Sequence, residues 1–269
     1  VTPNTFLQTF IVDIRAAVAA VQQEKHEDLR NKNTKDIYKI WYGVGHKDES
    51  NIEKAVYGLP ELFRDDIKKA HLIANPGCYP TSVILALAPL VKEDLYDTNK
   101  VIIADSKSGV TGAGRKADIS ISFAEVNESL KAYKVNEHQH MPEMIEVLSK
   151  IGAKKPDLVF VPHLIPMNRG ILSTSYVHLK GGLTTEKLIA LYGKFYKNAL
   201  FVRVLDKGIF PEVKEVAHTN ICEIGIKVDE EKKLAIIVSC IDNLQKGAAG
   251  QAVQNMNIMA NFEETEGLL

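Results

Sequence analysis

The stretch Asn75-Pro76-Gly77-Cys78-Tyr79-Pro80 is the most informative part of this sequence. The apolar run 71–74 before it is typical of a short strand, and the run 81–90 after it is typical of a helix. The sequence therefore predicts a strand–turn–helix unit with Cys78 at or near the helix N-terminus. Free N–H groups and the positive end of the helix dipole favour a thiolate there, which makes Cys78 a candidate nucleophile for acyl transfer. The alternative is a small buried Cys at a strand–helix junction.

Composition places the chain among globular proteins with one large domain or two small ones. Its 269 residues are 45% hydrophobic and 25% charged, with a net charge of −1, so no global field draws it to nucleic acid or to a membrane surface. The sequence has no apolar run long enough to span a bilayer and no signal-peptide pattern at residues 1–6. We therefore expect a cytoplasmic protein that binds neither nucleic acid nor membrane.

The cysteines argue for reduced thiols. Cys78, Cys222 and Cys240 are odd in number and far apart, which suits a cytosolic protein better than a disulfide framework. Their spacing excludes a compact CxxC metal site. Zinc held by His138, His140 and a Cys stays an alternative without an evident fourth ligand, so we expect no metal. Cys222 and Cys240 lie in apolar runs typical of core strands.

Periodicity predicts helix–strand alternation first and mainly strands from 155 to 241. Apolar spacing indicates a helix over 6–22, a second amphipathic helix over 184–199 and a last one over 245–261. Strands are expected at the short apolar runs 101–104, 158–161, 172–179, 201–204, 220–228 and 234–241. This order predicts an α/β protein with a partial doubly wound part, followed by an α+β part with a mainly antiparallel sheet.

Three further motifs carry candidate chemistry. His138 and His140 are two residues apart, so in an extended segment they point to opposite sides and only one faces a thiol; Pro142 then starts a helix. A near-neutral imidazole can hold a thiolate and later protonate a leaving oxygen. The Gly-rich run 106–116 can cradle an anion, and the planar fork of Arg169 suits a carboxylate or phosphate.

Several motifs in register resemble one family, the N-acetyl-gamma-glutamyl-phosphate reductases. The resemblance runs from about residue 28 to the C-terminus. It rests on segments that include Ile73-Ala-Asn-Pro-Gly-Cys-Tyr-Pro-Thr81, Tyr57-Gly-Leu-Pro-Glu-Leu62, Ser108-Gly-Val-Thr-Gly-Ala-Gly-Arg115, Asn136-Glu-His-Gln-His-Met-Pro-Glu143, Phe160-Val-Pro-His-Leu-Ile-Pro-Met-Asn-Arg-Gly170 and Asp242-Asn-Leu-Gln-Lys-Gly-Ala-Ala-Gly-Gln-Ala252.

The resemblance implies a glyceraldehyde-phosphate-dehydrogenase-like fold and a homo-oligomer, either dimer or tetramer. It divides the chain into a partial dinucleotide-binding domain (1–77), a catalytic and oligomerisation domain (78–241) and a C-terminal helix that returns to the cofactor domain (242–269). The implied activity is NADPH-dependent reduction of N-acetyl-L-glutamyl 5-phosphate to the semialdehyde through a Cys thioester, in arginine biosynthesis. The alternatives are the same chemistry on an amino-adipate or aspartate acyl phosphate, or a non-catalytic remnant of such a reductase.

The resemblance also implies roles for individual residues. Cys78 is the nucleophile and His140 the acid/base. The expected substrate contacts are Arg30, Asn75, His138 and Arg169, and the expected contacts with NADP(H) are Ser108, Gly109, Gly112, Gly114, Asn243 and Gly247.

One feature departs from the family. A strand–Gly-x-x-Gly-x-x-Gly–helix fingerprint, on which a dinucleotide pyrophosphate rests, is absent from residues 1–70. The assignment of Arg30 as a substrate contact rests only on the poorly matching segment His26-Glu27-Asp28-Leu29-Arg30. The sequence therefore predicts that the chain forms an acyl-enzyme but binds NADPH more weakly than a complete reductase does.

Overall fold

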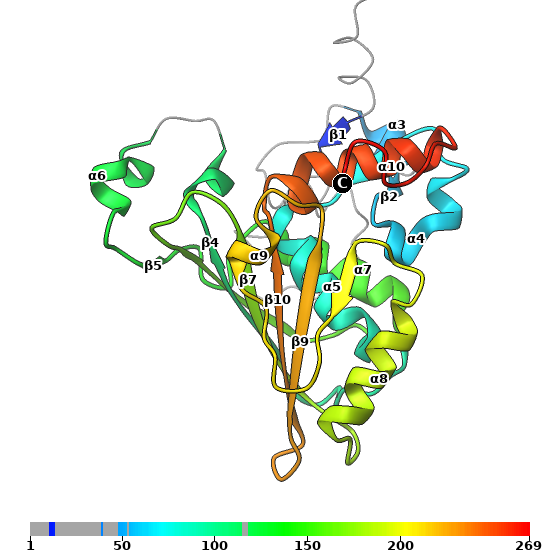
Figure 1. Cartoon of the computed structure of the whole chain (residues 1–269), viewed down its shortest axis with the longest axis vertical. Coiled ribbons are helices and arrows are strands. Elements are labelled where there is room, and N and C mark those ends of the chain that lie inside the picture. Colours follow the sequence, from blue (N-terminus) through cyan, green and yellow to red (C-terminus); the bar gives the residue numbers. More distant parts are fainter. Residues whose placement is uncertain (1–10, 14–38, 40–47, 53, 115–117) are drawn as a thin grey trace, which may run out of the picture.

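The computed structural model describes residues 11–13, 39, 48–52, 54–114 and 118–269, which form two sheets with their helices (Figure 1). The smaller sheet has the strand order β1-β3-β2 and is parallel throughout, with β1 at Ile11–Asp13, β3 at Ile73–Asn75 and β2 at Val56–Tyr57. Helices α3 (Glu49–Ile52) and α4 (Pro60–Ile67) flank β2 in the sequence. Parallel pairing of this kind is typical of doubly wound domains.

The helix predicted over residues 6–22 is wrong where the structure describes that range. Ile11–Asp13 form β1, and Ile11 pairs with Ile73 of β3; the other residues of the predicted helix lie outside the described part of the chain. Two successive β-branched residues, Ile11 and Val12, favour a strand, and pairing with β3 supplies backbone hydrogen bonds that periodicity does not reveal.

The larger sheet has seven strands among the described residues. Four of its six pairings are antiparallel, which confirms the predicted mainly antiparallel sheet. In spatial order the strands are β5 (Lys131–Ala132), β6 (Leu158–Leu164), β4 (Ile102–Ser108), β7 (Ile171–His178), β10 (Leu234–Ile241), β9 (Cys222–Asp229) and β8 (Val202–Val204).

Helices α5 (Cys78–Lys92), α7 (His140–Ile151) and α8 (Thr185–Phe195) lie to one side of this sheet (Figure 1). α5 is the centre of the core, because every residue from 79 to 91 is buried and its sequence is apolar all round. Pro89 lacks the N–H that would bond to Leu85, and the Tyr196 hydroxyl donates to that carbonyl instead, at 2.6 Å. Tertiary contacts thus satisfy the backbone of this buried helix.

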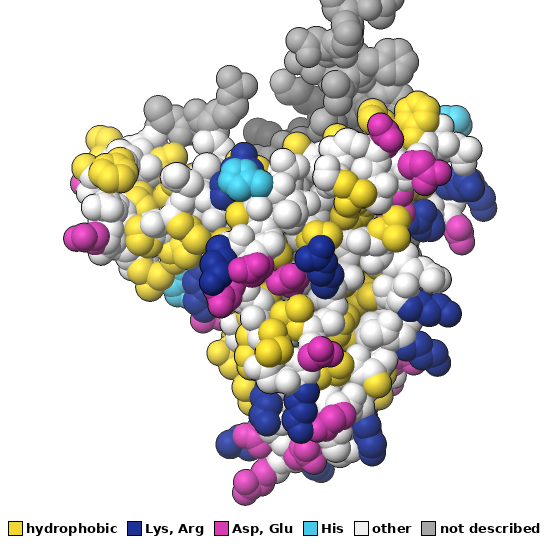
Figure 2. All heavy atoms as spheres, in the orientation of Figure 1, with side chains coloured by type: hydrophobic (Ala, Val, Ile, Leu, Met, Phe, Trp, Pro, Cys, Tyr) yellow, Lys and Arg dark blue, Asp and Glu magenta, His cyan; other side chains and the backbone are white. Residues whose placement is uncertain are grey.

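Between β4 and β5 the chain forms an arm that projects from the sheet (Figure 1). It contains short helical turns η3 (Val110–Ala113), η4 (Ile119–Ile121) and α6 (Phe123–Val126). Large apolar side chains stand exposed on the arm, with Ile119 at 80% and Phe123 at 83%. Figure 2 shows hydrophobic side chains gathered over this part of the surface. An exposed apolar group of this kind is typical of an interaction surface.

The C-terminal part returns to the smaller sheet. After α9 (Val213–Val216) and the last two strands, the π-helical turn η5 (Gln245–Ala249) leads into α10 (Gly250–Met259). The Asn255 amide of α10 donates to the Gly58 carbonyl at 2.8 Å and to the side-chain oxygen of Asn75 at 3.0 Å. Among the described residues, the structure has no helix long and apolar enough to cross a bilayer.

Candidate active site

Cys78 is the first residue of α5, as the sequence predicts. β3 ends at Asn75, and Gly77 is the N-cap with an extended backbone and no side chain to cap the helix. The Cys78 side chain is half-buried. Orphan N–H groups and the helix dipole stabilise a thiolate at this position. Pro80 fits in the first turn because the N–H that it lacks has no partner within the helix.

His138 and His140 lie together on one side, because the segment is not extended, which was the condition for the two rings to point to opposite sides. Their ring centroids are 4.7 Å apart, and both residues are buried. The segment is not extended: Gln139 has helical dihedral angles and α7 begins at His140, two residues before Pro142. His140 lies against Gly77, because a Cβ built on Gly77 would sit 2.6 Å from its Nε2. The structure thus brings His140 to the residue before Cys78.

His138 is a neutral imidazole near pH 7. Burial, followed by the nearby positive charge of Lys134, lowers the pKa of His138 to about 3. Its Nδ1 accepts the backbone N–H of His140 at 3.2 Å, so the ring proton of the neutral form is on Nε2. Its ring meets the Tyr79 ring edge-on, at 5.4 Å between centroids. His138 therefore serves better as a neutral donor than as a proton-accepting base.

Glu143 is a site residue that the sequence reading missed. It is one turn along α7 from His140, its exposure is 1%, and its Oε1 accepts the Gly77 N–H at 2.9 Å and the Tyr57 hydroxyl at 2.8 Å. Burial and the Glu143 charge raise the pKa of Tyr57, which keeps its proton as a donor. The spacing of three between His140 and Glu143 was the available signal, since such residues share a helix face.

Two tyrosines lie within electrostatic reach of the Cys78 thiol. The Tyr79 and Tyr133 hydroxyls are 3.1 Å apart. Burial raises the pKa of Tyr133 to about 12; the Tyr79 hydrogen bond lowers it, and the charge of Cys78 adds to the rise. Burial, with Tyr133 and Cys78 as further causes, also raises the pKa of Tyr79. Both phenols stay protonated and remain hydrogen-bond donors near the thiol.

The Gly-rich loop packs against the 167–170 turn. The Gly109 N–H donates to the Gly170 carbonyl at 2.9 Å, and a Cβ on Gly109 would sit 2.7 Å from the Asn168 carbonyl oxygen. A Cβ on Gly112 would sit 2.8 Å from Ser108 Oγ. Gly114 is exposed with φ +83°, a conformation that favours glycine. Close backbone packing therefore requires glycine at Gly109, whereas Gly114 is favoured by its backbone conformation.

Asn243 ties this loop to the C-terminal part. Its side-chain oxygen accepts the Gly170 N–H at 2.7 Å, and its amide donates to Thr111 Oγ1 at 3.0 Å. Gly247 lies four residues further on, and a Cβ there would sit 2.8 Å from Cys78 Cβ. The structure thus brings Asn243 and the Gly-rich loop together, and Gly247 against the Cα and Cβ of Cys78.

Asn75 and Arg169 are both engaged by the protein itself. The Asn75 amide donates to the Ala248 carbonyl at 3.1 Å, which links the end of β3 to η5. Arg169 pairs with the fully buried Asp242 at 3.1 Å and contacts His218 Nδ1 at 3.2 Å, with 30% of its side chain exposed. Asp242, a second residue that the sequence reading missed, also accepts the Leu244 and Gln245 N–H groups and so caps η5.

The other thiols are core residues. Cys222 and Cys240 are fully buried, and burial raises the pKa of both, that of Cys240 to about 12. In the described part of the chain there is no group of three or more His, Cys, Asp or Glu side chains placed to hold a metal ion. Arg30 lies outside the described residues.

Solved structures share the fold. Aspartate semialdehyde dehydrogenase II from Vibrio cholerae superposes with a TM-score of 0.61 at 16% identity, over 78% of this chain and 69% of that chain. The Francisella tularensis aspartate semialdehyde dehydrogenase gives 0.61 at 17% identity, over 77% of this chain and 71% of that chain. At such identities the likeness establishes the architecture alone, and it confirms the predicted fold class.

Sequence comparisons identify the family. A family model described as "Semialdehyde dehydrogenase, dimerisation domain" matches residues 78–243. The N-acetyl-gamma-glutamyl-phosphate reductase of Thermoanaerobacter pseudethanolicus is 52% identical over 232 residues, which are 86% of this chain and 67% of that protein. The one from Lachnoclostridium phytofermentans is 46% identical over 268 residues, 99% of this chain and 76% of that protein. The chain therefore belongs to the N-acetyl-gamma-glutamyl-phosphate reductase family.

Proposed function

We propose that this chain reduces N-acetyl-L-glutamyl 5-phosphate to the 5-semialdehyde, with release of phosphate, as a step of arginine biosynthesis. One observation carries the assignment of the reactive atom. Cys78 begins the buried helix α5, with His140 against the preceding Gly77 and Gly247 against its own Cβ. Of the three cysteines, Cys78 alone combines partial exposure with a helix N-terminus.

The residues support a thioester route. The Cys78 thiolate forms a bond to the acyl carbon, and the bond from that carbon to the phosphate oxygen breaks, so the phosphate leaves with both electrons. Amides at the start of α5 stabilise the negative charge that develops on the acyl oxygen. His140 holds a proton for the departing phosphate oxygen. An acyl phosphate is already activated, so this step needs no metal.

The second half of the reaction regenerates the thiol. NADPH, when bound, supplies a hydride to the thioester carbon. The carbon–sulfur bond then breaks, its electron pair returns to Cys78, and the aldehyde leaves. The protonated Tyr79 and Tyr133 hydroxyls, near Cys78, help to exclude bulk water from the thioester.

The described residues fit the nicotinamide end of a dinucleotide. In parallel sheets, ligands bind at the carboxyl ends of strands, and β3 leads from its carboxyl end directly to Cys78. The exposed Gly112 presents backbone without a side chain beside Asn243, as a flat ring needs. We propose NADP(H) rather than NAD(H) for this place. To test that choice, the chain is titrated into NADPH and the fluorescence of the cofactor is followed. NADH is the matched control.

A single-turnover experiment tests the activity. The chain is mixed with N-acetylglutamyl phosphate without NADPH, and we expect one equivalent of phosphate and a mass increase on the peptide that contains Cys78. Addition of NADPH then removes the added mass and oxidises the cofactor. Phosphate release at an unchanged rate by Cys78→Ser, which lacks a comparable nucleophile, contradicts the proposal. Phosphate release without NADPH oxidation points to the weak cofactor binding expected from the missing fingerprint.

We also propose that the chain forms a dimer through the sheet face opposite α5, with the arm beside it. The outward residues of one cross-strand row are apolar: Ile103, Tyr176 and Ile236 are adjacent partners on β4, β7 and β10. Ile103 is 38% exposed. The match to a dimerisation domain over 78–243 and the exposed apolar arm both favour a second copy as the partner of this face.

A further inference from the structure

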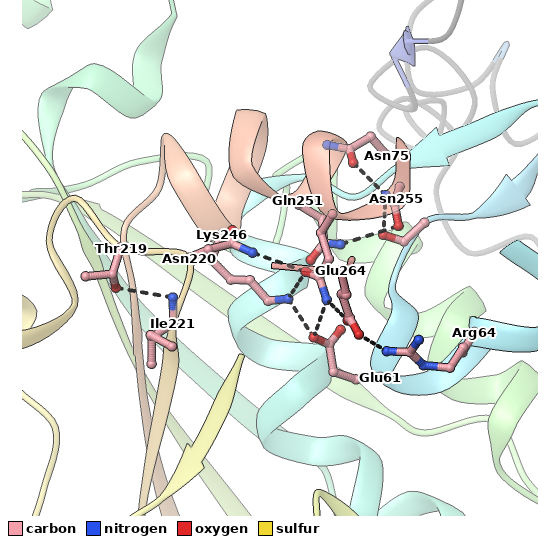
Figure 3. A network of polar contacts seen from close by, with 12 residues as sticks. Glu61, Arg64, Asn75, Thr219, Asn220, Ile221, Lys246, Gln251, Asn255 and Glu264 are labelled. Carbon is pink, nitrogen blue, oxygen red and sulfur yellow. Dashed lines mark hydrogen bonds and ion pairs between the residues drawn. The ribbon is translucent and has the colours of Figure 1, made fainter. Parts of the chain in front are cut away.

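A buried ion pair joins the turn beside Cys78 to the first helix after β2. Lys246 Nζ lies 2.6 Å from Glu61 Oε1, and the two side chains are 0% and 1% exposed. Lys246 also donates to Gln254 Oε1 at 2.7 Å and lies 5.6 Å from the centre of the Phe201 ring. Figure 3 shows Lys246 and Glu61 meeting between η5, α4 and α10. The pair thus connects α4 to the continuous segment formed by η5 and α10, although Glu61 and Lys246 are 185 residues apart.

Lys246 is adjacent to the residue that contacts the thiol-bearing carbon. Gly247 follows Lys246 in η5, and its Cα faces Cys78 so closely that a Cβ would sit 2.8 Å from Cys78 Cβ and 3.2 Å from Cys78 Cα. π-helical turns are rare and are frequently found at functional sites. Lys246 and Gly247 are consecutive residues, so a displacement of Lys246 also displaces Gly247. The ion pair therefore fixes the position of Gly247 relative to Cys78.

Stability alone accounts poorly for this arrangement. Burying two charges costs most of what their attraction returns, and apolar residues of similar volume often serve as well. The second oxygen of Glu61, Oε2, is buried without a hydrogen-bond partner among the described residues, which adds to the cost. In some proteins, buried ionic groups of this kind fix a unique geometry rather than add stability.

We propose that Lys246, anchored by Glu61, is a positioning residue that acts through Gly247 to hold Cys78 in the orientation needed for attack on an acyl phosphate. The inference rests on the proposed role of Cys78 as the nucleophile. A thiolate that forms normally but points wrongly still reacts with a small alkylating agent, whereas directed attack on an acyl carbon slows steeply. The ratio of the two rates therefore reports orientation separately from thiolate formation.

The test compares two reactions of Cys78 in three forms of the whole chain. Lys246→Met with Glu61→Gln removes the anchor and both charges together, so no charge is left buried alone. Arg64→Gln is the control, because it breaks the Arg64–Glu264 pair in the same network without touching η5. Circular dichroism and urea unfolding establish that each form is folded. Alkylation by iodoacetamide is followed by peptide mass, and acylation by phosphate release from acetyl phosphate.

We expect the double variant to release phosphate at least about tenfold more slowly, while its Cys78 alkylation rate changes by less than about threefold. Arg64→Gln should keep the ratio of the unmodified chain. An unchanged ratio in the double variant overturns the inference, and so does an equal fall of both rates, which would assign Lys246 to thiolate formation. Failure of the unmodified chain to react at Cys78 overturns instead the proposed nucleophile.

Discussion

The Glu143 carboxylate accepts the backbone N–H of Gly77 at 2.9 Å, and this bond joins the first turn of α7 to the N-terminus of the helix that carries Cys78. The same oxygen accepts the Tyr57 hydroxyl at 2.8 Å. A buried carboxylate with two donors is a strong structural constraint, because hydrogen bonds to charged groups exceed neutral ones in strength. Glu143 therefore fixes the distance between α7, which brings His140, and the turn before Cys78.

Glu143→Ala should lower the free energy of unfolding by about 2–4 kcal/mol, since it leaves two buried donors unsatisfied and opens a cavity. Tyr57→Phe removes only one of the two hydrogen bonds and should cost about 1 kcal/mol. Urea unfolding measures both. A cost for Glu143→Ala no greater than that for Tyr57→Phe would show that the Gly77 hydrogen bond contributes little.

Cys78 should be the only fast-reacting thiol. Burial raises the pKa of Cys222 and Cys240, whereas Cys78 is half-buried at a helix N-terminus. Brief iodoacetamide treatment near neutral pH, followed by peptide mass mapping, should label Cys78 at least about tenfold faster than either core thiol. Labelling of all three at similar rates contradicts this.

His138 should make the protein less stable as the pH falls. Its pKa is about 3 in the folded chain, below the value near 6.5 expected when unfolded, so between these values the unfolded state binds a proton that the folded state does not. Stability from this group is complete above about pH 6.5 and falls by up to about 1.4 kcal/mol per pH unit below it. His138→Gln should flatten that slope in urea unfolding between pH 7.5 and 5, while the same change at the exposed His71 leaves it unchanged. Equal slopes for His138→Gln and the unmodified chain would be the contrary result.

His140→Ala should slow acylation of Cys78 and shift its alkylation to higher pH, because loss of an adjacent imidazolium raises the pKa of a thiol. His138→Ala should instead weaken substrate binding. A pH profile of alkylation for each variant separates the two roles. A shifted profile in His138→Ala with an unchanged one in His140→Ala reverses the assignment.

Gly247→Ala should perturb the site directly, because the new Cβ meets Cys78 Cβ at 2.8 Å. We expect a loss of about 1–3 kcal/mol of stability and a slower acylation. Gly193→Ala is the matched control: it is exposed in α8 with nothing within 4 Å of its Cβ, and alanine there should stabilise by up to about 1 kcal/mol. Thermal unfolding and phosphate release are measured for both variants. Equal results for the two would contradict an effect of the close contact between Gly247 and Cys78.

Ile103→Glu should prevent association if the apolar row on β4, β7 and β10 is the dimer face, because each copy would then bury an unpaired carboxylate in the interface. Light scattering after gel filtration measures the mass. Met256→Glu, on the exposed side of α10, should leave the mass unchanged. A dimer that survives Ile103→Glu excludes this face.

Local periodicity, turn residues and motif order along the chain are enough to predict the strand–turn–helix unit around Cys78, the mainly antiparallel second sheet and the family. The contacts within the site follow instead from tertiary packing. β1 replaced a predicted helix because pairing with Ile73–Asn75 outweighed local periodicity. The two histidines came to one side because α7 begins at His140. Glu143 and Asp242 became site residues because Gly77 and Arg169, 66 and 73 residues away, meet them in space. The packing of helices and strands determines such partners. It joins residues that are far apart in the sequence, and their separation does not indicate that they meet.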